Sequence, residues 1–495
     1  MRVRAESIDP VAVQADVLAV PIYRTDRDWP ADLAALDEAC GGAIAAALSW
    51  GEFNPIEDET GLIEVKGIGA KRILLVASGR RGRGSWRARR SASKATRRLQ
   101  GRGATRLAVW LRDGEGADAF AAAAIGASQG TFRPHAYYGR VRDTPAMLRS
   151  VEELVLIGDG APDEAVLEMA MATSDGVEWA RTLSNRSAND LNPEAMAGLA
   201  RELEADGCTV EILGPAEMAA LGMGALLGVG QGAAHEPRLI AIKLPGWQNG
   251  GDRRLAIVGK GVCFDSGGIS LKAPERMEEM KHDKAGAAAV IAAARTVARL
   301  APQTPLMAVA PMVENMPGGN AQRPGDVVKA MNGMTIEVIN TDAEGRLILA
   351  DALHWAETQG ATHIVDVATL TGAAAVAFGD LISAYFARPR EWGGAVQAAA
   401  DATGEWFWEM PLATTYRDSL DSAHADIVNS ASREGSLIKS AVFLSEFVTV
   451  PWVHIDIGGS AYLIRDKAHN PKGSLGTTVS TLVRLALDFP AGSPH

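Results

Sequence analysis

Charged residues in the C-terminal half of the chain have the types and spacing of a metal-dependent hydrolytic centre. The acids are Asp265, Asp283, Asp342 and Glu344, and the bases are Lys260, Lys272 and Arg346. Carboxylate oxygens are the ligands that hard divalent cations prefer. Four carboxylates balance the charge of two such ions, and burying them without cations would be very costly. The set therefore predicts a centre for two divalent metal ions.

The basic residues have roles of their own in such a centre. Lys260 would join the ligands only as a neutral amine, and two adjacent dications would lower its pKa enough to allow this. Lys272 and Arg346 would stay charged, and cations are natural partners for the oxyanion that forms when a carbonyl is attacked. The residues alone therefore favour hydrolysis through a tetrahedral intermediate.

The sequence around these residues indicates how they could meet. Asp342 and Glu344 are two positions apart after a strand-like segment, and an extended backbone would direct both side chains to one face. Asp283 precedes a helical stretch, where a single aspartate is more often a helix cap than a ligand. Its inclusion depends on the rest of the set. The backbone is expected to run close to the site at three glycines, Gly267, Gly268 and Gly345.

The elements that must position the site alternate between short β-rich runs and alanine-rich helical stretches, which is typical of α/β folds with mostly parallel sheets. A first series of strands is predicted at 17–22, 73–77, 107–111 and 154–158. A second series is predicted at 239–244, 255–259, 307–311, 335–340, 363–368 and 452–457. Helices are predicted at 284–300 and 346–358. A long helix at 163–185 separates the two series, so we expect an N-terminal α/β domain at 1–162 and a C-terminal α/β/α catalytic domain at 186–495.

Composition limits the class of protein. The chain has 495 residues, of which 47% are apolar and 22% charged, enough for two domains with buried cores. Three cysteines without metal-like spacing argue against a disulfide framework. We see no apolar run long enough to cross a membrane and no secretory signal. The net charge of -11 gives no general attraction to nucleic acid or anionic membranes. We expect a cytoplasmic protein without a membrane partner.

One segment departs from this acidic average. Lys71 to Arg106 contains thirteen Lys or Arg and no Asp or Glu. Some of these bases recur at helical spacing, namely Arg87, Arg90, Lys94 and Arg97. We favour a solvated helix face, because long basic side chains also cover apolar surface. The alternative is a surface that binds nucleic-acid phosphates, with further basic surface from neighbouring subunits.

Other motifs are weak. The Gly259-Lys260 pair lacks the earlier glycine and the following Ser or Thr of a phosphate-binding P-loop. The glycine-rich run at 228–233 follows a helical stretch and not a strand, which argues against dinucleotide binding. His235-Glu236 is not followed by the second histidine of the helical zinc-protease signature.

The run from Asn340 to Leu347 resembles the signature of the leucyl aminopeptidase family, the hexameric cytosolic two-metal aminopeptidases. Similar pieces at 223–232, 315–317, 320–327, 368–372 and 454–457 extend the resemblance over roughly residues 175 to 490. The N-terminal part shows no specific motif, and its α/β pattern is compatible with the macro-domain-like N-terminal domain of that family.

The resemblance implies a role for each charged residue. A tightly held metal would be bound by Lys260, Asp265, Asp283 and Glu344, and a more exchangeable one by Asp265, Asp342 and Glu344. Two-metal aminopeptidases place their ions about 3.5 to 4 Å apart with a hydroxide between them. The free α-amine of a peptide would bind one metal and the scissile carbonyl the other, which makes the enzyme an exopeptidase. Lys272 would stabilise the gem-diolate, and Arg346 would hold a bicarbonate ion as the general base.

The resemblance also implies the metals and the substrate. Oxygen ligands with one amine do not select one ion sharply, and Mn or Zn is expected. The residues implied to bind substrate are Met280, Thr369, Leu370, Gly372, Gly458 and Ala461. They suggest a roomy apolar pocket for Leu or another apolar N-terminal residue. Lys284 departs from the family, which usually has Met there. We expect Lys284 to extend from the helix start to solvent; otherwise its charge would favour acidic N-terminal residues.

The leading hypothesis is therefore a metal-dependent leucyl-type aminopeptidase that acts on peptides as a homohexamer. The second is a DNA-binding accessory protein with a secondary peptidase site, which the stretch from Lys71 to Arg106 motivates. A third, an inactive scaffold, is disfavoured because every expected ligand is present.

Overall fold

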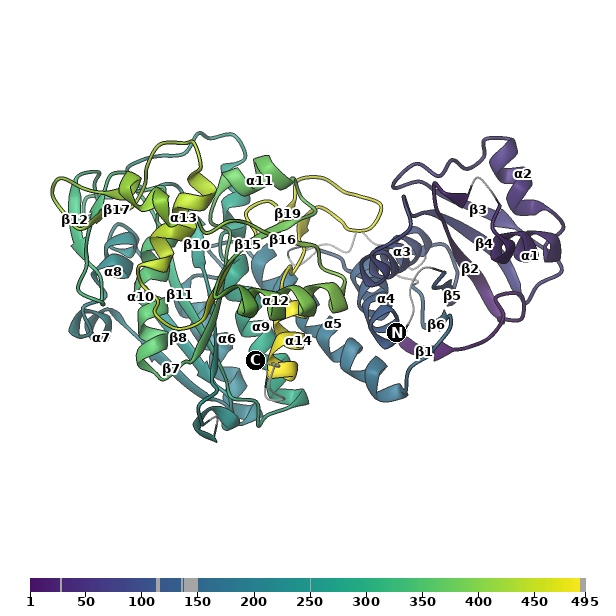
Figure 1. Ribbon diagram of the computed structural model, residues 1–495, viewed down its shortest axis with the longest axis horizontal. Coiled ribbons are helices and arrows are strands. Elements are labelled where there is room, and N and C mark those ends of the chain that lie inside the picture. Colours follow the sequence, from purple (N-terminus) through teal and green to yellow (C-terminus); the bar gives the residue numbers. More distant parts are fainter. Residues whose placement is uncertain (27–28, 113–115, 135–136, 138–149, 250, 490–495) are drawn as a thin grey trace. The chain divides into compact units, whose positions relative to one another are not determined.

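The computed structural model describes residues 1–26, 29–112, 116–134, 137, 150–249 and 251–489 (Figure 1). The chain divides into two units within helix α5 (Glu164–Asn185). The first unit contains Met1–Glu178 and two short segments from much later in the chain, Asp401–Glu405 and Leu463–Gly473. The second unit contains Trp179–Ala400, Trp406–Tyr462 and Ser474–His495. The first unit is therefore discontinuous in sequence.

The first unit contains a six-stranded sheet with the order β1-β6-β5-β2-β4-β3, parallel except at β3. Its strands are β1 (Arg2–Glu6), β2 (Ala15–Ile22), β3 (Thr60–Glu64), β4 (Ala70–Ala77), β5 (Arg106–Trp110) and β6 (Glu153–Ile157). Its helices besides α5 are α1 (Ala31–Ala39), α2 (Ala43–Ser49), α3 (Gly84–Leu99) and α4 (Gly116–Thr131). Helices α1 and α2 pack on one face of the sheet, and α3 and α4 pack on the other.

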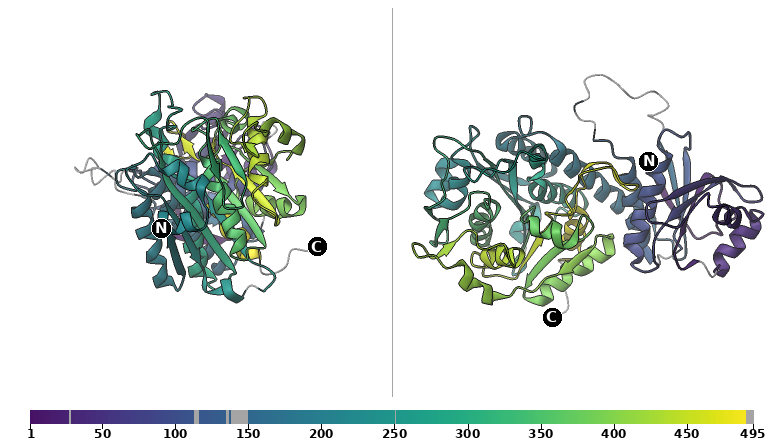
Figure 2. Two further views of the ribbon diagram at one scale, coloured as in Figure 1. Left: turned by 90° about the vertical axis from the view of Figure 1, so that its left-hand side faces the viewer. Right: turned by 90° about the horizontal axis from the view of Figure 1, so that it is seen from above.

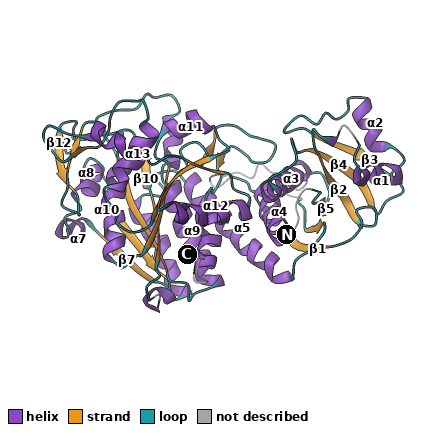
Figure 3. Cartoon of the chain, viewed as in Figure 1, coloured by secondary structure: helices purple, strands orange, loops and turns teal. Residues whose placement is uncertain are grey.

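The second unit contains a nine-stranded sheet with the order β16-β15-β18-β14-β9-β11-β8-β7, and β10 pairs with β11. Figure 3 shows the strands in orange. The strands are β7 (Thr209–Leu213), β8 (Arg238–Lys243), β9 (Leu255–Gly259), β10 (Gly261–Asp265), β11 (Leu306–Asn315), β14 (His363–Ala368), β15 (Ser383–Arg388), β16 (Phe407–Glu409) and β18 (Trp452–Asp456). A smaller sheet contains β12 (Asp326–Lys329), β13 (Thr335–Val338) and β17 (Ile427–Val428). The short strands β19 (Tyr462–Leu463) and β20 (Gly473–Ser474) form a further pair.

Helices cover both faces of the nine-stranded sheet, as the end-on view in Figure 2 shows. They are α6 (Pro193–Arg201), α7 (Pro215–Ala220), α8 (Gly224–Gly230), α9 (Ala285–Leu300), α10 (Gly345–Thr358), α11 (Gly372–Phe378), α12 (Arg390–Thr403), α13 (Ser436–Ser445) and α14 (Val479–Asp488). Two alternate residues of β9, Ala256 and Val258, belong to one hydrophobic core together with residues of α8, α10 and α13. Helix α9 also contacts β9, but its residues are not part of that core. Strand β11 is buried along its whole length, as expected of a central strand covered on both faces.

Strands β9, β10, β11, β14 and β18 are parallel to their neighbours in this set. Their carboxyl ends therefore meet at one edge of the sheet, which is where ligands bind in open α/β sheets. The residues that follow these strands are positioned by the sheet itself.

The predicted fold class, an α/β chain with two domains and a mostly parallel central sheet, is confirmed. Every predicted strand coincides with a strand of the structure, although β13 belongs to the small sheet. The expected extended backbone at Asp342 and Glu344 is wrong. Strand β13 ends at Val338, and both acids lie in the turn that precedes α10. No helix within the described part of the chain has both the length and the hydrophobicity that a membrane crossing requires.

The close packing of α9 on the sheet gives a first prediction. A Cβ atom at Gly286 would lie 2.2 Å from the carbonyl oxygen of Val367 and 2.8 Å from the amide nitrogen of Lys260. Because both are backbone atoms, we expect Gly286→Ala to lower the free energy of unfolding by about 1–3 kcal/mol. Gly198→Ala in α6 is the control, because a Cβ there meets nothing within 4 Å.

We expect the control to be neutral or slightly stabilising, by roughly 0.5–1 kcal/mol. Urea denaturation followed by tryptophan fluorescence measures both variants. Equal unfolding midpoints for the two variants would contradict the packing of α9 described above.

Candidate active site

Residues predicted to carry the chemistry lie at the carboxyl edge of the nine-stranded sheet. Lys260 directly follows β9, and Asp265 is the last residue of β10. Carboxylate oxygens of Asp265, Asp342 and Glu344 lie within 4.8 Å of one another. Asp283 joins this group at the end of the 3-10 helix η4 (Met277–His282). The structure thus brings all four predicted carboxylates to one place.

Two lysines connect the carboxylates. The Nζ atom of Lys260 lies 2.8 Å from Asp283 Oδ2 and 2.8 Å from Glu344 Oε1. The Nζ atom of Lys272 lies 2.7 Å from Asp265 Oδ2 and also pairs with Asp342. Each lysine therefore bridges two carboxylates, and together the six side chains form one charged cluster, the acid–lysine cluster.

The carboxylates of this cluster carry more negative charge than the lysines balance. Burial, and then the neighbouring Glu344 carboxylate, raise the pKa of Asp265 above its usual value. Burial raises the pKa of Asp283 strongly, with Glu344 and Asp265 adding to the effect against Lys260. Burial and Asp265 raise the pKa of Asp342. Four carboxylates that share two ammonium groups fit a site for additional cations.

The pKa values of the two lysines also reflect the excess of negative charge in the cluster. Burial opposes the charge of Lys260, but Asp283, Glu344 and Asp265 outweigh it and raise its pKa above the usual value. Lys272 is also held as a cation, because Asp265, Glu344 and Asp342 outweigh its burial and raise its pKa. As metal ligands, the carboxylate oxygens together with the Lys260 amine suit hard or borderline divalent ions.

Glycines let the backbone approach this cluster, as predicted. The φ angles of Gly267 and Gly268 are +88° and +67°, and a Cβ atom at Gly267 would lie 2.9 Å from Asp342 Oδ1. A Cβ atom at Gly345 would lie 2.7 Å from Lys260 Cε. A side chain at Gly345 would therefore displace the Lys260 amine.

Asparagines that were not predicted from the sequence organise the ligand loops. The Nδ2 atom of Asn315, at the end of β11, donates to Asp265 Oδ1 at 2.8 Å and to the carbonyl of Thr341 at 3.0 Å. Asn429 is fully buried, and its Oδ1 accepts from the amides of Ile339 and Asn340 at 3.0 and 3.3 Å. Both therefore tie the segment before Asp342 to the rest of the site. Asn315 could have been suspected from the sequence only because it is a polar residue at the end of an apolar strand. Nothing in the sequence around Asn429 indicates its role.

Arg346 is a buried cation, and among the described residues its guanidinium forms no ion pair with a carboxylate of the acid–lysine cluster. Its Nη1 donates to the carbonyl of Asn429 at 2.8 Å, and its Nε has no partner among the described residues. Burial lowers the pKa of Arg346 to about 10, against the carboxylates of Glu344 and Asp456. A buried guanidinium with an unused donor fits the binding of a small anion.

Residues predicted to bind substrate lie on two loops and on η4. Thr369, Leu370 and Gly372 follow β14; Gly458 and Ala461 follow β18; Met280 lies in η4. The carbonyl of Thr369 accepts from Lys260 Nζ at 3.0 Å, and its hydroxyl donates to Asp283 Oδ1 at 2.7 Å. The loop after β14 is thus attached to the acid–lysine cluster. Asp283 is accordingly no helix cap: Lys284 occupies the N-cap position of α9.

The expectation that Lys284 extends to solvent is wrong. The side chain is fully buried, and burial lowers its pKa to about 8. Its Nζ donates to the carbonyls of Arg186 at 2.8 Å and Lys281 at 2.7 Å, with Cys263 at 3.5 Å. Lys284 is buried because it stands at the start of α9, which is itself buried from its first turn. Lys284 therefore joins three backbone segments.

The basic helix α3 also differs from the sequence-based expectation of a solvated face. Lys94 is 2% exposed and pairs with Asp58 at 3.2 Å. Arg90 pairs with Glu57 at 3.1 Å and with Asp58 at 3.2 Å, and Arg97 pairs with Asp466 at 2.9 Å. The acidic partners come from segments distant in sequence, which is why the spacing on α3 did not reveal them. Little of this basic charge is left for nucleic-acid phosphates.

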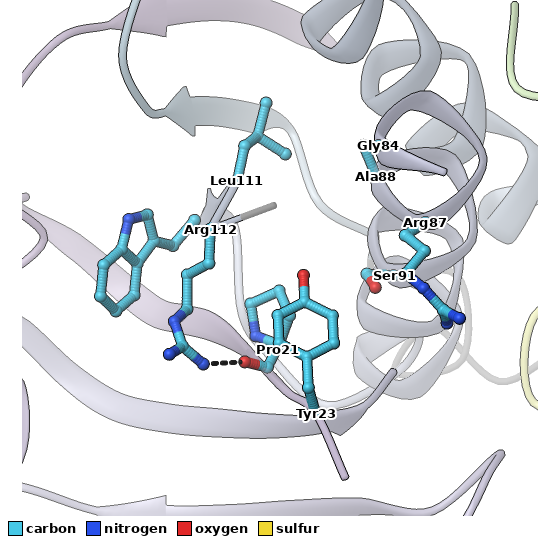
Figure 4. A pocket seen from close by; sticks show the side chains of 9 residues that line it. Pro21, Tyr23, Gly84, Arg87, Ala88, Ser91, Leu111 and Arg112 are labelled. Atoms are coloured by element: carbon cyan, nitrogen blue, oxygen red, sulfur yellow. Dashed lines mark hydrogen bonds between the residues drawn. The ribbon is translucent and has the colours of Figure 1, made fainter. Parts of the chain in front are cut away.

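In a small pocket beside α3, a basic side chain is likewise paired within the protein (Figure 4). Tyr23 and Arg112 line it, and Arg112 Nη1 donates to the carbonyl of Pro21 at 2.7 Å. The same atom pairs with Asp26 at 2.7 Å. The basic side chain is therefore already bound within the protein.

The fold and the site define an α/β protein whose catalytic edge gathers carboxylates and lysines suited to divalent cations. Comparison with known sequences names the family. The catalytic-domain model of the cytosol aminopeptidase family matches residues 178–483, and the model of its N-terminal domain matches residues 19–138. The chain belongs to the cytosol aminopeptidase family and is an aminopeptidase, a hydrolase.

Relatives and solved structures agree with this assignment. A probable cytosol aminopeptidase of Solibacter usitatus is 42% identical over 97% of this chain and 98% of its own length. A mutant of the tomato leucine aminopeptidase has a TM-score of 0.84 at 32% identity and covers 98% of this chain, with 96% of its own chain matched. The bottromycin maturation enzyme BotP in complex with Mn has a TM-score of 0.79 at 33% identity, over 96% of this chain and all of its own.

Proposed function

We propose that the protein is a metal-dependent leucyl-type aminopeptidase, which removes Leu and other apolar residues from the N-termini of peptides by a two-metal mechanism. One observation carries this proposal: four buried or half-buried carboxylates share two lysines at the carboxyl edge of the sheet. An excess of buried negative charge of this kind calls for divalent cations.

The proposed ligand sets are those that the family resemblance implies, and all of their residues belong to the acid–lysine cluster. The first metal would be held by Lys260, Asp265, Asp283 and Glu344, and the second by Asp265, Asp342 and Glu344. We propose Mn or Zn for both positions. The complex of BotP with Mn supports the choice of Mn, because BotP is similar to this chain in fold and sequence. Bound metal ions polarise a carbonyl and lower the pKa of water, which supplies both the electrophile and the nucleophile for hydrolysis.

The side chains beside the metals would act on the peptide itself. Lys272, held as a cation at the rim of the cluster, would stabilise the negative charge that develops on the scissile carbonyl oxygen. Arg346 would hold a bicarbonate ion, for which its unused buried Nε is suited. The bicarbonate would take up the proton of the attacking water, because no histidine belongs to the acid–lysine cluster within the described residues.

The proposed pocket for the first side chain of the peptide uses residues from η4 and from the two loops. They are Met280, Thr369, Leu370, Gly372, Gly458 and Ala461. Small and apolar residues leave room for a leucine-sized side chain. Because Lys284 is buried and bound to backbone carbonyls, we do not propose a preference for acidic N-terminal residues.

We further propose a cytoplasmic homohexamer that acts on peptides, with an N-terminal domain at 1–162, a linker helix at 163–185 and a catalytic domain at 186–495. Nucleic-acid binding is not proposed, because the acidic side chains around α3 pair with its bases.

Metal removal tests the proposed function. We expect the enzyme treated with EDTA and desalted to lose activity on leucine p-nitroanilide, and added Mn or Zn to restore it, because the carboxylates alone provide no electrophile. A panel of p-nitroanilides with different first residues measures the preference. Activity that survives complete removal of metal, verified by elemental analysis, would rule the mechanism out.

A further inference from the structure

A buried carboxylate behind the substrate loops takes no part in the acid–lysine cluster. Asp456, the last residue of β18, is 1% exposed. Within the described residues it forms no ion pair with a lysine or arginine at contact distance, although its charge raises the pKa of Arg346 against the effect of burial. Burying a carboxylate without a cation is costly unless hydrogen bonds replace its water. The groups that donate hydrogen bonds to the Asp456 carboxylate therefore indicate its role.

Within the described residues, the groups that donate hydrogen bonds to the Asp456 carboxylate come from the two segments that carry the proposed substrate pocket. Its Oδ1 accepts from the amides of Leu370 at 3.2 Å, Thr371 at 3.4 Å and Gly458 at 2.9 Å. Its Oδ2 accepts from the Thr371 hydroxyl at 2.7 Å. One carboxylate thus holds the loop after β14 and the loop after β18 together.

The loop after β14 is fixed at its other end by the proposed metal ligands. Thr369 binds Lys260 through its carbonyl and Asp283 through its hydroxyl. Residues 369–371 are therefore held between the acid–lysine cluster and Asp456. The Thr371 hydroxyl also accepts from the amide of Ala374 at 3.1 Å, so the same contact fixes the start of α11.

The two loops touch closely where Asp456 joins them. A Cβ atom at Gly458 would lie 2.4 Å from the carbonyl oxygen of Thr371 and 3.0 Å from Asp456 Oδ1. There is no space for a side chain at this position, so the distance between the loops is set by backbone contact and by the carboxylate. A small shift of the carboxylate would move both walls of the proposed pocket.

We propose that Asp456 is a positioning residue that fixes the loop Thr369–Gly372 relative to Gly458, and thereby determines how tightly the first residue of a peptide is bound. Asp456 acts through the loop and does not touch the substrate. The inference rests on the proposed function, because that function assigns the pocket to these loops.

Asp456→Asn in the full-length enzyme tests this role. The amide loses the charge and turns one acceptor into a donor, so that either the Thr371 hydroxyl or the backbone amides lose their partner. We expect KM for leucine p-nitroanilide to rise about tenfold or more while kcat falls less than about threefold, because the loop binds the ground state and the transition state alike. The metal content should stay that of the wild type.

Asp366→Asn is the matched control for the loss of a buried carboxylate. Asp366 lies on the neighbouring strand β14, is fully buried, and accepts from Trp452 Nε1 at 2.7 Å and from His454 Nδ1 at 2.6 Å. In the part of the chain that the structure describes, no hydrogen bond or ion pair joins the Asp366 side chain to these loops. A merely structural role for both aspartates would lower the thermal midpoint of both variants and leave KM unchanged, whereas a positioning role raises KM only for Asp456→Asn.

A second pair of variants tests the same contact from the loop. Thr371→Val removes the hydroxyl that donates to Asp456, and Thr371→Ser keeps it. We expect Val to raise KM severalfold and Ser to restore a value within about twofold of the wild type. This pair decides the question if Asp456→Asn does not fold.

Two results would overturn the inference: a KM for Asp456→Asn within about twofold of the wild type, or a Thr371→Ser enzyme as impaired as Thr371→Val. A wild-type enzyme without metal-dependent activity would instead refute the proposed function. The two failures are therefore distinguishable in one set of measurements.

Discussion

Asp265→Asn is expected to lower kcat/KM by about 10³-fold or more, since it weakens both proposed metal positions at once, whereas loss of an outer-shell partner costs about 10–100-fold. Asp265 is buried and hydrogen-bonded to Asn315 at 2.8 Å, so an amide keeps the shape of the site. The neutral side chain removes one negative charge from the acid–lysine cluster. We expect fewer than two metal ions per chain by elemental analysis.

Asp351→Asn is the control for this experiment. Asp351 is a fully buried carboxylate of α10 that accepts from the amides of Leu226 and Met331, each at 2.8 Å. It has no contact with the acid–lysine cluster among the described residues. We expect the control to lose stability at most, and to keep its metal content and its KM. An Asp265→Asn enzyme with full metal content and at least a tenth of wild-type activity would contradict the proposed ligand set.

Lys272→Met should lower kcat by about 10²- to 10³-fold, the cost of removing one donor that stabilises an oxyanion. Lys272 pairs with Asp265 and Asp342, and its side chain is 23% exposed. Of the two lysines in the cluster it is the more exposed, since the Lys260 side chain is only 4% exposed. Methionine removes the charge and the hydrogen-bond donors and leaves an unbranched apolar side chain that is one atom shorter. Since the interaction forms in the transition state, kcat and kcat/KM should fall together.

The control for Lys272 is Lys439→Met, which removes a buried lysine that binds the hydroxyl of Ser432 at 2.8 Å. Both variants need their metal content measured beside their steady-state kinetics. If Lys272→Met raises KM and leaves kcat unchanged, Lys272 binds the ground state and is not the oxyanion partner.

Much of the catalytic unit could be predicted from the sequence, because strong apolar strand patterns and charged residues lie next to each other in that part of the chain. The apolar runs that became β9, β11, β14 and β18 are buried on both faces, which makes their signal strong. The charged residues directly follow such strands or their connecting turns. The Asp342 turn was mispredicted because the short, mostly polar connection between β13 and α10 carries no periodic signal.

The unpredicted part depends on contacts between distant segments. Asn429 acts on Asn340 across 89 positions, and its own neighbours in sequence give no hint of that contact. Lys284 stands at the buried start of α9, and the carbonyls that its Nζ binds include those of Arg186 and Cys263, which lie far from it in sequence. Likewise, the partners of Arg90 and Lys94 lie on segments that the helix pattern of α3 cannot reveal.

The discontinuous first unit has a consequence for biosynthesis. Helix α3 is made early, yet the carbonyl of Thr403 that Arg89 binds at 2.8 Å and the carbonyl of His469 that Ser93 binds at 2.5 Å are made near the end of the chain. The amino-terminal unit therefore cannot complete its packing while the ribosome is still translating the catalytic sequence. Shortened polypeptides that stop before residue 463 should leave Ser93 and Arg97 of α3 without their late partners, His469 and Asp466, and become substrates for quality-control proteolysis.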